Sequence, residues 1–112
     1  MANILGMLRT RFRPAIVDLV EPLSDPALIE WSLNLIRYKG QPFADYQVDC
    51  CMGLAKKLKL SGRVVATRII DAVDVDDFCY PLKITGPGFI NIRIRDEWLA
   101  DTLTELAREC PV

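Results

Sequence analysis

The side chains best suited to chemistry lie on one stretch of alternating residues in the C-terminal third of the chain. Residues 89–95 read Phe-Ile-Asn-Ile-Arg-Ile-Arg, and alternating apolar residues are typical of a half-buried β-strand. We assign the isoleucines to the core, so that the opposite face carries the other four side chains, Phe89, Asn91, Arg93 and Arg95. Residues 80–85 are expected to form the preceding strand, with Lys83 and Thr85 on that same outer face.

An outer sheet face with an aromatic ring, an amide and several cations suits unpaired RNA bases. Phe89 would stack on a base, an interaction of about 1–3 kcal/mol. Asn91 offers a donor and an acceptor to a base edge, for about 1–3 kcal/mol of discrimination. The cations Lys83, Arg93 and Arg95 would hold phosphates, which positions RNA without reading its sequence. The pattern alone leaves an alternative open, in which Phe89 only covers the sheet edge and Asn91 is an ordinary polar strand residue.

The segment Gly86-Pro87-Gly88 separates these two strands. Proline second and glycine third in residues 86–89 predict a type II turn, which requires a positive φ at its third residue. A glycine-rich phosphate loop is the alternative. No lysine and no helix start follow this segment, so we interpret it as a structural turn.

Other kinds of site find no support in the sequence. The chain has no histidine, which removes the commonest general base and the Ser-His and Cys-His nucleophile pairs. No C-x-x-C pair occurs among the cysteines, so we predict no metal site and four reduced thiols: Cys50, Cys51, Cys79 and Cys110. The acidic run at residues 74–77 is interpreted as a solvated loop. We therefore predict no catalytic residue in this chain.

Composition indicates one globular domain. The chain has 112 residues, of which 51% are hydrophobic and 26% charged, with a net charge of −1. No apolar run approaches the ~18 residues of a membrane span, and residues 1–13 lack a signal-peptide cleavage pattern. We expect a cytoplasmic protein without a membrane partner. The charges are segregated, which lets one face meet phosphates, with basic groups at Arg9, Arg11 and Arg13, at Lys56, Lys57, Lys59 and Arg63, and at Arg93 and Arg95.

The remaining elements follow from hydrophobic periodicity. A helix is predicted from Ile4 to Val20, with a kink or break at Pro14. The other predicted elements are a strand at 29–35, a turn at 39–42, a shorter strand at 45–50, and helices at 51–60 and 63–73. Asp96 is predicted to cap a last helix, whose buried stripe would comprise Trp98, Leu99, Leu103, Leu106 and Ala107.

The resulting order of elements is α-β-β-α-α-β-β-α. Clustered strands, rather than alternating strand and helix, favour an α+β fold. We predict a two-layer sandwich in which an antiparallel sheet of about four strands has helices packed on one face.

Two motifs resemble a known family. Residues 86–92, GPGFINI, resemble the G-P-G-F-I-N signature of the amino-terminal domain of arginyl-tRNA synthetases. Residues 43–47, FADYQ, and 52–58, MGLAKKL, resemble the family's F-G-D-Y-Q segment and the A-K-K-L helix after it. The resemblance covers almost the whole chain. The chain departs from the family at Ala44, where glycine is usual, and at Asp49, where asparagine is common. We expect the polar residues of the first motif to be mainly structural: Asp45, Tyr46 and Gln47.

The resemblance implies a role in tRNA binding. In this family the domain is a two-layer α/β appendage that contacts the D-loop at the outer corner of tRNA, where an aromatic residue and an asparagine read a base. By motif position these are Phe89 and Asn91. The implied partners are tRNA(Arg) and the remainder of the synthetase, without DNA, and the implied protein is a monomer.

The resemblance also implies that the chemistry lies elsewhere. The parent enzyme would be a class I arginine–tRNA ligase that uses ATP with magnesium, through a histidine-containing signature that this chain lacks. This chain would then hold no cofactor, and residues 1–112 would be one domain without the catalytic and anticodon-binding domains. We interpret Cys110-Pro111-Val112 as a domain edge followed by a linker. The alternative, favoured by the acidic net charge, is a structural domain that packs on a protein partner without contacting tRNA.

Overall fold

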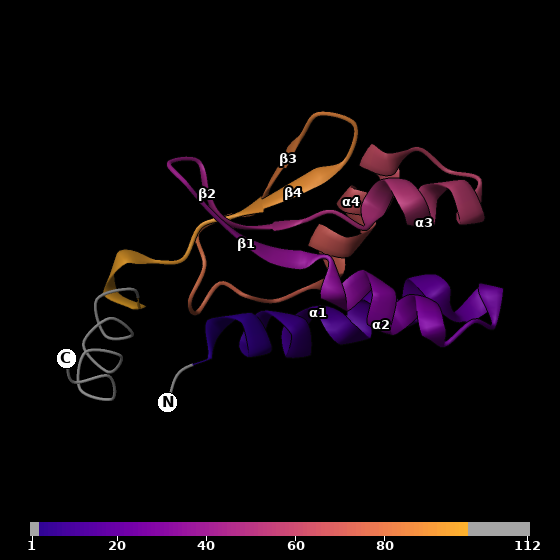
Figure 1. The fold of residues 1–112 in the computed structure, drawn as a ribbon, viewed down its shortest axis with the longest axis horizontal. Helices are drawn as coiled ribbons and strands as arrows, with labels where there is room; N and C mark the ends of the chain where they lie inside the picture. Colours follow the sequence, from indigo (N-terminus) through magenta and orange to yellow (C-terminus); the bar gives the residue numbers. More distant parts are fainter. Residues whose placement is uncertain (1–2, 99–112) are drawn as a thin grey trace.

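The computed structural model of the protein describes residues 3–98 (Figure 1). In chain order its elements are the helices α1 (Ile4–Val20), η1 (Glu21–Leu23) and α2 (Ala27–Asn34), the strands β1 (Ile36–Gln41) and β2 (Ala44–Val48), the helices α3 (Cys51–Leu58) and α4 (Gly62–Ala72), and the strands β3 (Lys83–Thr85) and β4 (Phe89–Ile92).

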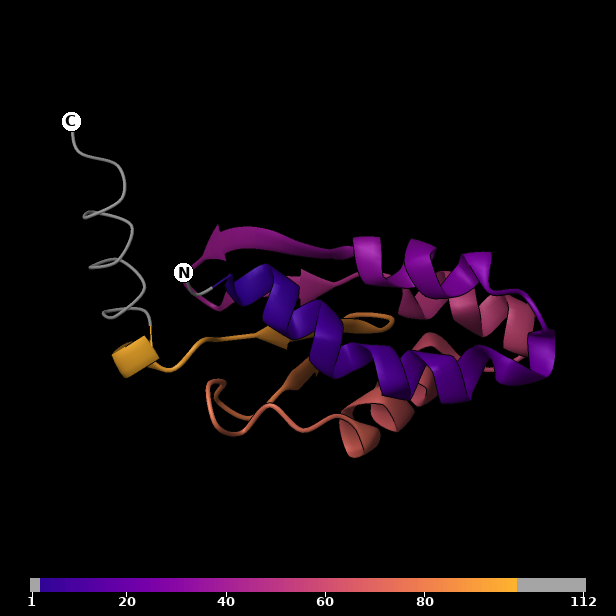
Figure 2. The ribbon, with the colours of Figure 1, turned by 90° about the horizontal axis from the view of Figure 1, so that it is seen from below.

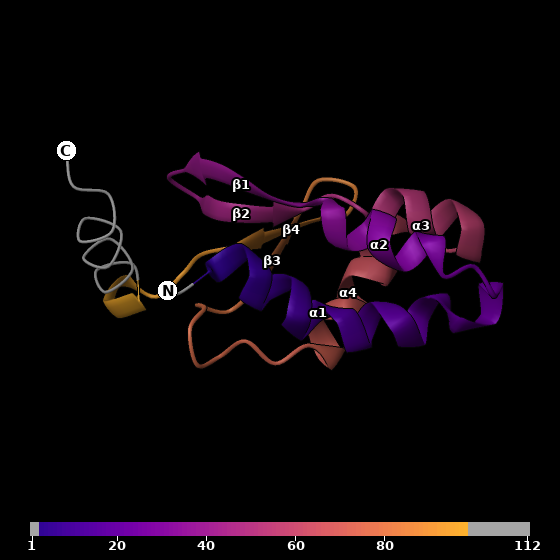
Figure 3. The same ribbon diagram turned by 60° about the horizontal axis from the view of Figure 1, so that its bottom comes forward.

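The four strands form one antiparallel sheet in the order β1-β2-β4-β3. Helix α1 runs beneath the strands in Figures 1 and 3, and crosses them in the view from below in Figure 2. Helix α4 contacts β3 and β4, α2 contacts α1 and β1, and α3 packs on α4. One core joins these elements, with Phe12 of α1, Phe78 and Ile90 of β4 among its fully buried side chains. The predicted α+β sandwich with an antiparallel sheet is confirmed.

The predicted strand at 29–35 is wrong, because Ala27–Asn34 form helix α2. Its buried residues are Leu28, Ser32 and Leu33, a spacing of three to four residues that belongs to one helix face. Trp31, which the alternating pattern would bury, is 43% exposed. The apolar residues of this short segment fit both the two-residue period of a strand and the 3.6-residue period of a helix. Packing against α1 favours the helix.

The strand that the pattern placed at 29–35 begins at Ile36 and runs through the predicted turn at 39–42. Gly40 has φ +61°, and the pairing of β1 with β2 shifts register between Tyr38 and Gln41. A glycine tolerates that backbone conformation at no steric cost. The hairpin therefore turns at residues 42–43.

Other boundaries move by a few residues. Helix α1 is continuous through Pro14, so no break occurs there. The strands β3 and β4 are shorter than the predicted ranges 80–85 and 89–95, although Cys79 and Ile94 form an isolated bridge beyond them. A helical turn begins at Asp96 itself, and the predicted helix from Leu99 onward lies outside the described residues. Within residues 3–98 no helix is long and apolar enough to cross a membrane.

Candidate nucleic-acid interface

Strand register places four polar side chains in one row across the sheet. Gln47 of β2 is paired with Asn91 of β4, and these residues are paired in turn with Arg37 of β1 and Lys83 of β3. Directly paired residues point to the same face of a sheet. The opposite face is the core, since the isoleucines of β4 and the bridge after it, Ile90, Ile92 and Ile94, are fully buried. The predicted division of this strand into a core face and a polar face is confirmed.

The amide of Asn91 is held in place by its neighbour. Gln47 Nε2 donates a hydrogen bond of 2.8 Å to Asn91 Oδ1, and Asn91 is 6% exposed. This bond uses one of the two lone pairs of the amide oxygen, so Asn91 keeps one acceptor position and both donors of its amide nitrogen for a ligand. The sequence predicted the face on which Asn91 lies. Its deep burial and its bond to Gln47 follow from register, which the sequence did not reveal.

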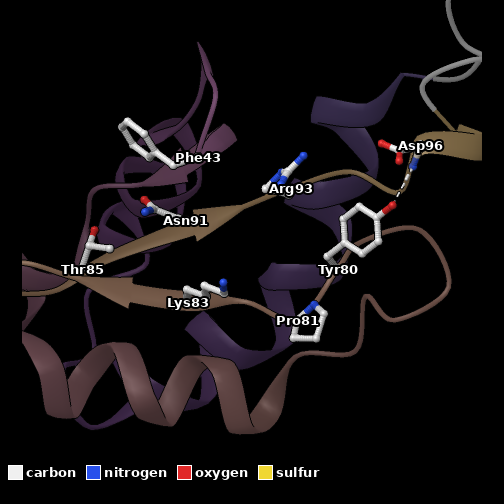
Figure 4. Close-up of a pocket in the computed structure, with 8 residues that line it drawn as sticks. All are labelled: Phe43, Tyr80, Pro81, Lys83, Thr85, Asn91, Arg93 and Asp96. Carbon is white, nitrogen blue, oxygen red and sulfur yellow. Dashed lines mark hydrogen bonds between the residues drawn. The ribbon is translucent and has the colours of Figure 1, made fainter.

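A hollow of about 690 Å³ opens on this face (Figure 4). It brings together three of the predicted site residues, Lys83, Asn91 and Arg93. Five further residues line it that sequence reasoning did not select: Phe43, Tyr80, Pro81, Thr85 and Asp96. No described helix passes over these eight side chains in Figure 4. The hollow therefore combines aromatic rings, an amide and cations on an open surface.

The other two predicted residues lie beside the hollow rather than in its lining. Phe89 is half-buried, and its ring lies next to the turn, where a Cβ added to Gly86 would be 3.5 Å from ring atom Cδ2. Arg95 Nε donates to the carbonyl of Asp76 at 2.9 Å. The guanidinium of Arg95 also stacks 5.2 Å from the ring centre of Tyr80. Arg95 thus supports Tyr80, whose ring lines the hollow, and is only partly exposed.

The turn before Phe89 rests on the start of α4. A Cβ on Gly62 would overlap the carbonyl oxygen of Pro87, and one on Gly88 would be 2.8 Å from the backbone of Gly62. Arg63 Nη1 also donates to the carbonyl of Gly86 at 2.7 Å. A turn is present, but the predicted type II turn over residues 86–89 is wrong. Its hydrogen bond joins Gly88 N to the carbonyl of Thr85, so Gly86, with φ +56°, is the second residue of the turn. Close backbone contact therefore accounts for the glycines at 62 and 88.

The other basic groups near the N-terminus have partners from distant parts of the chain. Arg11 forms a two-pronged pair with Asp77 at 2.8 and 2.9 Å, and this hydrogen bonding lowers the pKa of the Asp77 carboxyl. Arg13 pairs with Glu30 at 2.7 Å, and Arg9 donates to a backbone carbonyl. Arg11 and Arg13 are therefore engaged with acids rather than free to meet phosphates as the segregated charges suggested, whereas Arg9 bonds to backbone. Tertiary contacts supply the acids that neighbouring sequence does not.

The two departures from the family motif are accommodated. Ala44 is fully buried at the start of β2. Asp49 accepts from Arg37 Nη2 at 2.9 Å and lies 3.5 Å from Lys39 Nζ, which offsets its charge. Asp45 Oδ2 accepts from the backbone nitrogen of Ile94 at 2.8 Å, which confirms a structural role for that motif residue.

The cysteines of residues 3–98 lie apart from the sheet face that carries the predicted site. Cys50, Cys51 and Cys79 are free and buried, and Cys110 lies outside the described residues. No group of three potential ligands in this range could hold a metal ion. Lys83 and Arg93, by contrast, are exposed and form no ion pair within the same range.

An antiparallel sheet with helices on one face, and with amides, cations and aromatic rings on the other, defines a small two-layer α+β domain with one open sheet face. The family model described as "Arginyl tRNA synthetase N terminal domain" matches residues 7–94. The chain therefore belongs to this family.

Individual relatives agree with this assignment. The chain is 38% identical over 107 residues to an arginine–tRNA ligase of Pseudoalteromonas atlantica, covering 96% of this chain and 18% of the relative. It is 43% identical over 108 residues to that of Colwellia psychrerythraea, covering 96% and 17%. The solved structure of Thermus thermophilus arginyl-tRNA synthetase shares the fold, with a TM-score of 0.53 and 23% identity over 85% of this chain and 15% of that one. The chain spans less than a fifth of the length of these relatives.

Proposed function

We propose that this chain is the tRNA-binding domain of an arginine–tRNA ligase, and that its open sheet face contacts unpaired D-loop bases of tRNA(Arg). The observation that carries the proposal is the amide of Asn91, fixed by Gln47 beside the exposed cations Lys83 and Arg93. A fixed amide can recognise a base edge, and the cations can hold the adjoining phosphates. Phe89 adds a ring at the edge of this surface for base stacking.

The remainder of the synthetase would supply the chemistry. Attachment of arginine to tRNA with ATP and magnesium belongs to that larger body, whereas this domain would improve the grip on the correct tRNA. The two contributions are separable, because a contact at the outer corner of tRNA changes substrate binding and leaves the reacting groups untouched.

The test is tRNA binding by Asn91→Ala in the 112-residue chain. Removal of a contact of about 1–3 kcal/mol should raise the Kd for tRNA(Arg) roughly 5- to 150-fold. Asn34→Ala is the matched control, because Asn34 is exposed at the end of α2 and lies off the sheet face. In the complete synthetase, Asn91→Ala should raise the KM for tRNA and leave the KM for arginine unchanged. Equal Kd values for Asn91→Ala and Asn34→Ala would refute the proposal.

A second candidate function rests on a different surface. A hollow of about 460 Å³ where α1 meets α2 is lined by the apolar residues Val17, Val20, Pro26 and Ile29 and by Glu21, Ser24 and Asp25. Val17 is exposed. Such a surface suits packing on another protein domain. If this is the main role, Val17→Asp should release the domain from the catalytic body, and tRNA should leave the amide NMR signals of residues 83–93 unshifted.

A further inference from the structure

Phe43 is an aromatic residue on the RNA-facing side that the proposed function leaves without a role. It lies in the β1–β2 turn and is 58% exposed, although it lines the hollow next to Asn91. The chain around it is firmly held, because Ala44 is fully buried and Asp45 accepts a hydrogen bond from the backbone of Ile94. A rigid hairpin therefore presents a bare ring to solvent, at a cost in exposed apolar surface.

Register separates Phe43 from Phe89. Gln47 and Asn91 are paired, and β2 and β4 run in opposite directions. Phe89 is displaced two residues from this row toward one end of the sheet, and Phe43 is displaced four residues toward the other. At about 3.3 Å per residue, their backbones are on the order of 20 Å apart. Phe43 lines the hollow whereas Phe89 does not, so the two rings offer separate surfaces for stacking.

The hollow beside Phe43 has the remaining features of a nucleotide site. Its volume of about 690 Å³ lies in the range of small-ligand pockets, about 300–1,000 Å³. Lys83 and Arg93 supply exposed positive charge. The ring of Tyr80 forms a wall and lies 5.8 Å from the guanidinium of Arg93 and 5.2 Å from that of Arg95. In Figure 4 the ring of Phe43 and the amide of Asn91 lie on the same side of this wall.

We propose that Phe43 stacks on a second unpaired nucleotide, adjacent in the RNA to the one recognised at Asn91. This inference rests on the proposed function and extends it, because the face then binds two successive nucleotides. Stacking on an aromatic ring tolerates any base and contributes about 1–3 kcal/mol. The second subsite would therefore add affinity for single-stranded RNA, while Asn91 would add base discrimination.

The test compares Phe43→Leu with Phe43→Tyr in the 112-residue chain. Leucine keeps an apolar side chain but removes the planar ring, whereas tyrosine keeps the ring. Binding of tRNA(Arg) should weaken roughly 5- to 150-fold in Phe43→Leu and stay within about twofold in Phe43→Tyr. Trp31→Leu is the matched control, because Trp31 is also an exposed aromatic residue but lies on α2. It should bind as the unmodified chain does.

Three results would overturn the inference. If Phe43→Leu binds normally while Asn91→Ala still weakens binding, the second subsite fails and the proposed function stands. If neither variant weakens binding, the proposed function fails as well. If a glutamate decapeptide displaces tRNA from the unmodified chain as well as uridine dinucleotide does, the hollow selects negative charge rather than a nucleotide. The two single variants should also combine additively, because they contact different nucleotides.

Discussion

Gly62→Ala tests the contact on which the orientation of the turn before Phe89 depends. Gly62 is the first residue of α4, and the hydroxyl of Ser61 caps that helix by accepting from Val64 N at 3.2 Å. A Cβ at position 62 would overlap the carbonyl oxygen of Pro87 and lie 3.2 Å from Met52 Cγ. The obstacle is backbone, so the turn or the helix must move to admit one methyl group.

The expected loss of stability follows from two opposed effects. Overpacking of this kind costs about 1–3 kcal/mol, and replacing glycine by alanine in a helix returns about 0.5–1 kcal/mol. With the midpoints of these two ranges, the net loss is roughly 1 kcal/mol. For a domain of about 100 residues, each kcal/mol lowers Tm by about 4–8 °C. We expect Gly62→Ala to lower Tm by roughly 4–8 °C.

Gly53→Ala is the matched control, because Gly53 also lies in a helix. A Cβ there meets the outer edge of the Trp31 ring, and this exposed side chain can turn aside. Thermal unfolding followed by circular dichroism should therefore show a small change or a gain for Gly53→Ala. Gly62→Ala should also weaken tRNA binding at 20 °C, since Phe89 follows the displaced turn. A Tm for Gly62→Ala equal to or above that of Gly53→Ala would refute the reasoning.

Three other predictions follow from the same geometry. Gln47→Ala frees the Asn91 amide to rotate and should weaken tRNA binding by about 1 kcal/mol, or roughly fivefold, in fluorescence anisotropy titrations; binding at full strength would exclude a positioning role. Lys83→Ala and Arg93→Ala should each lower the slope of log K against log salt by about 1, and an unchanged slope would show that neither meets a phosphate. Burial raises the pKa of the Cys79 thiol from 9.0 to about 12. The stability linked to this thiol should be complete below pH 9 and be lost as the pH rises toward 12, and urea unfolding of the Cys79→Ser variant should lack this decline.

The sequence predicted the sheet face well because period-two alternation is a local property. Three alternating isoleucines fix which side of β4 is core, and Asn91 then lies opposite without any knowledge of the fold. The same local rule failed for residues 29–35. The buried residues of α2, which are Leu28, Ser32 and Leu33, belong to a helical stripe that overlaps the alternating pattern. Packing against α1 decided between the strand period and the helix period, and a local sequence pattern carries no information about such packing.

Residues that act through cross-strand or tertiary neighbours could not be predicted from the sequence, for a related reason. Gln47 stabilises Asn91 from 44 positions away, and Phe43 reaches the hollow only because its hairpin folds beside β4. The family motif drew attention to Gln47 as a structural residue, which is the nearest signal that the sequence offered. Arg11 was placed among the basic groups that could meet phosphates, because its partner Asp77 is 66 positions away. Register and tertiary contact, rather than residue type, complete this site.

Nearby acids offset part of the positive charge on this sheet face, so recognition should depend on the Asn91 amide and the aromatic rings more than on cations. Asp96 shares the rim of the hollow with Lys83 and Arg93, and Asp49 offsets Arg37 at the far end of the row. Few cations are left for phosphates, so the proposed binding gains little from general attraction to nucleic acid. Discrimination then has to come from the fixed amide and the aromatic rings, whose contacts require bases that are already unpaired. A domain of this kind would discriminate among RNA shapes presented by a larger enzyme and would bind duplex nucleic acid poorly on its own.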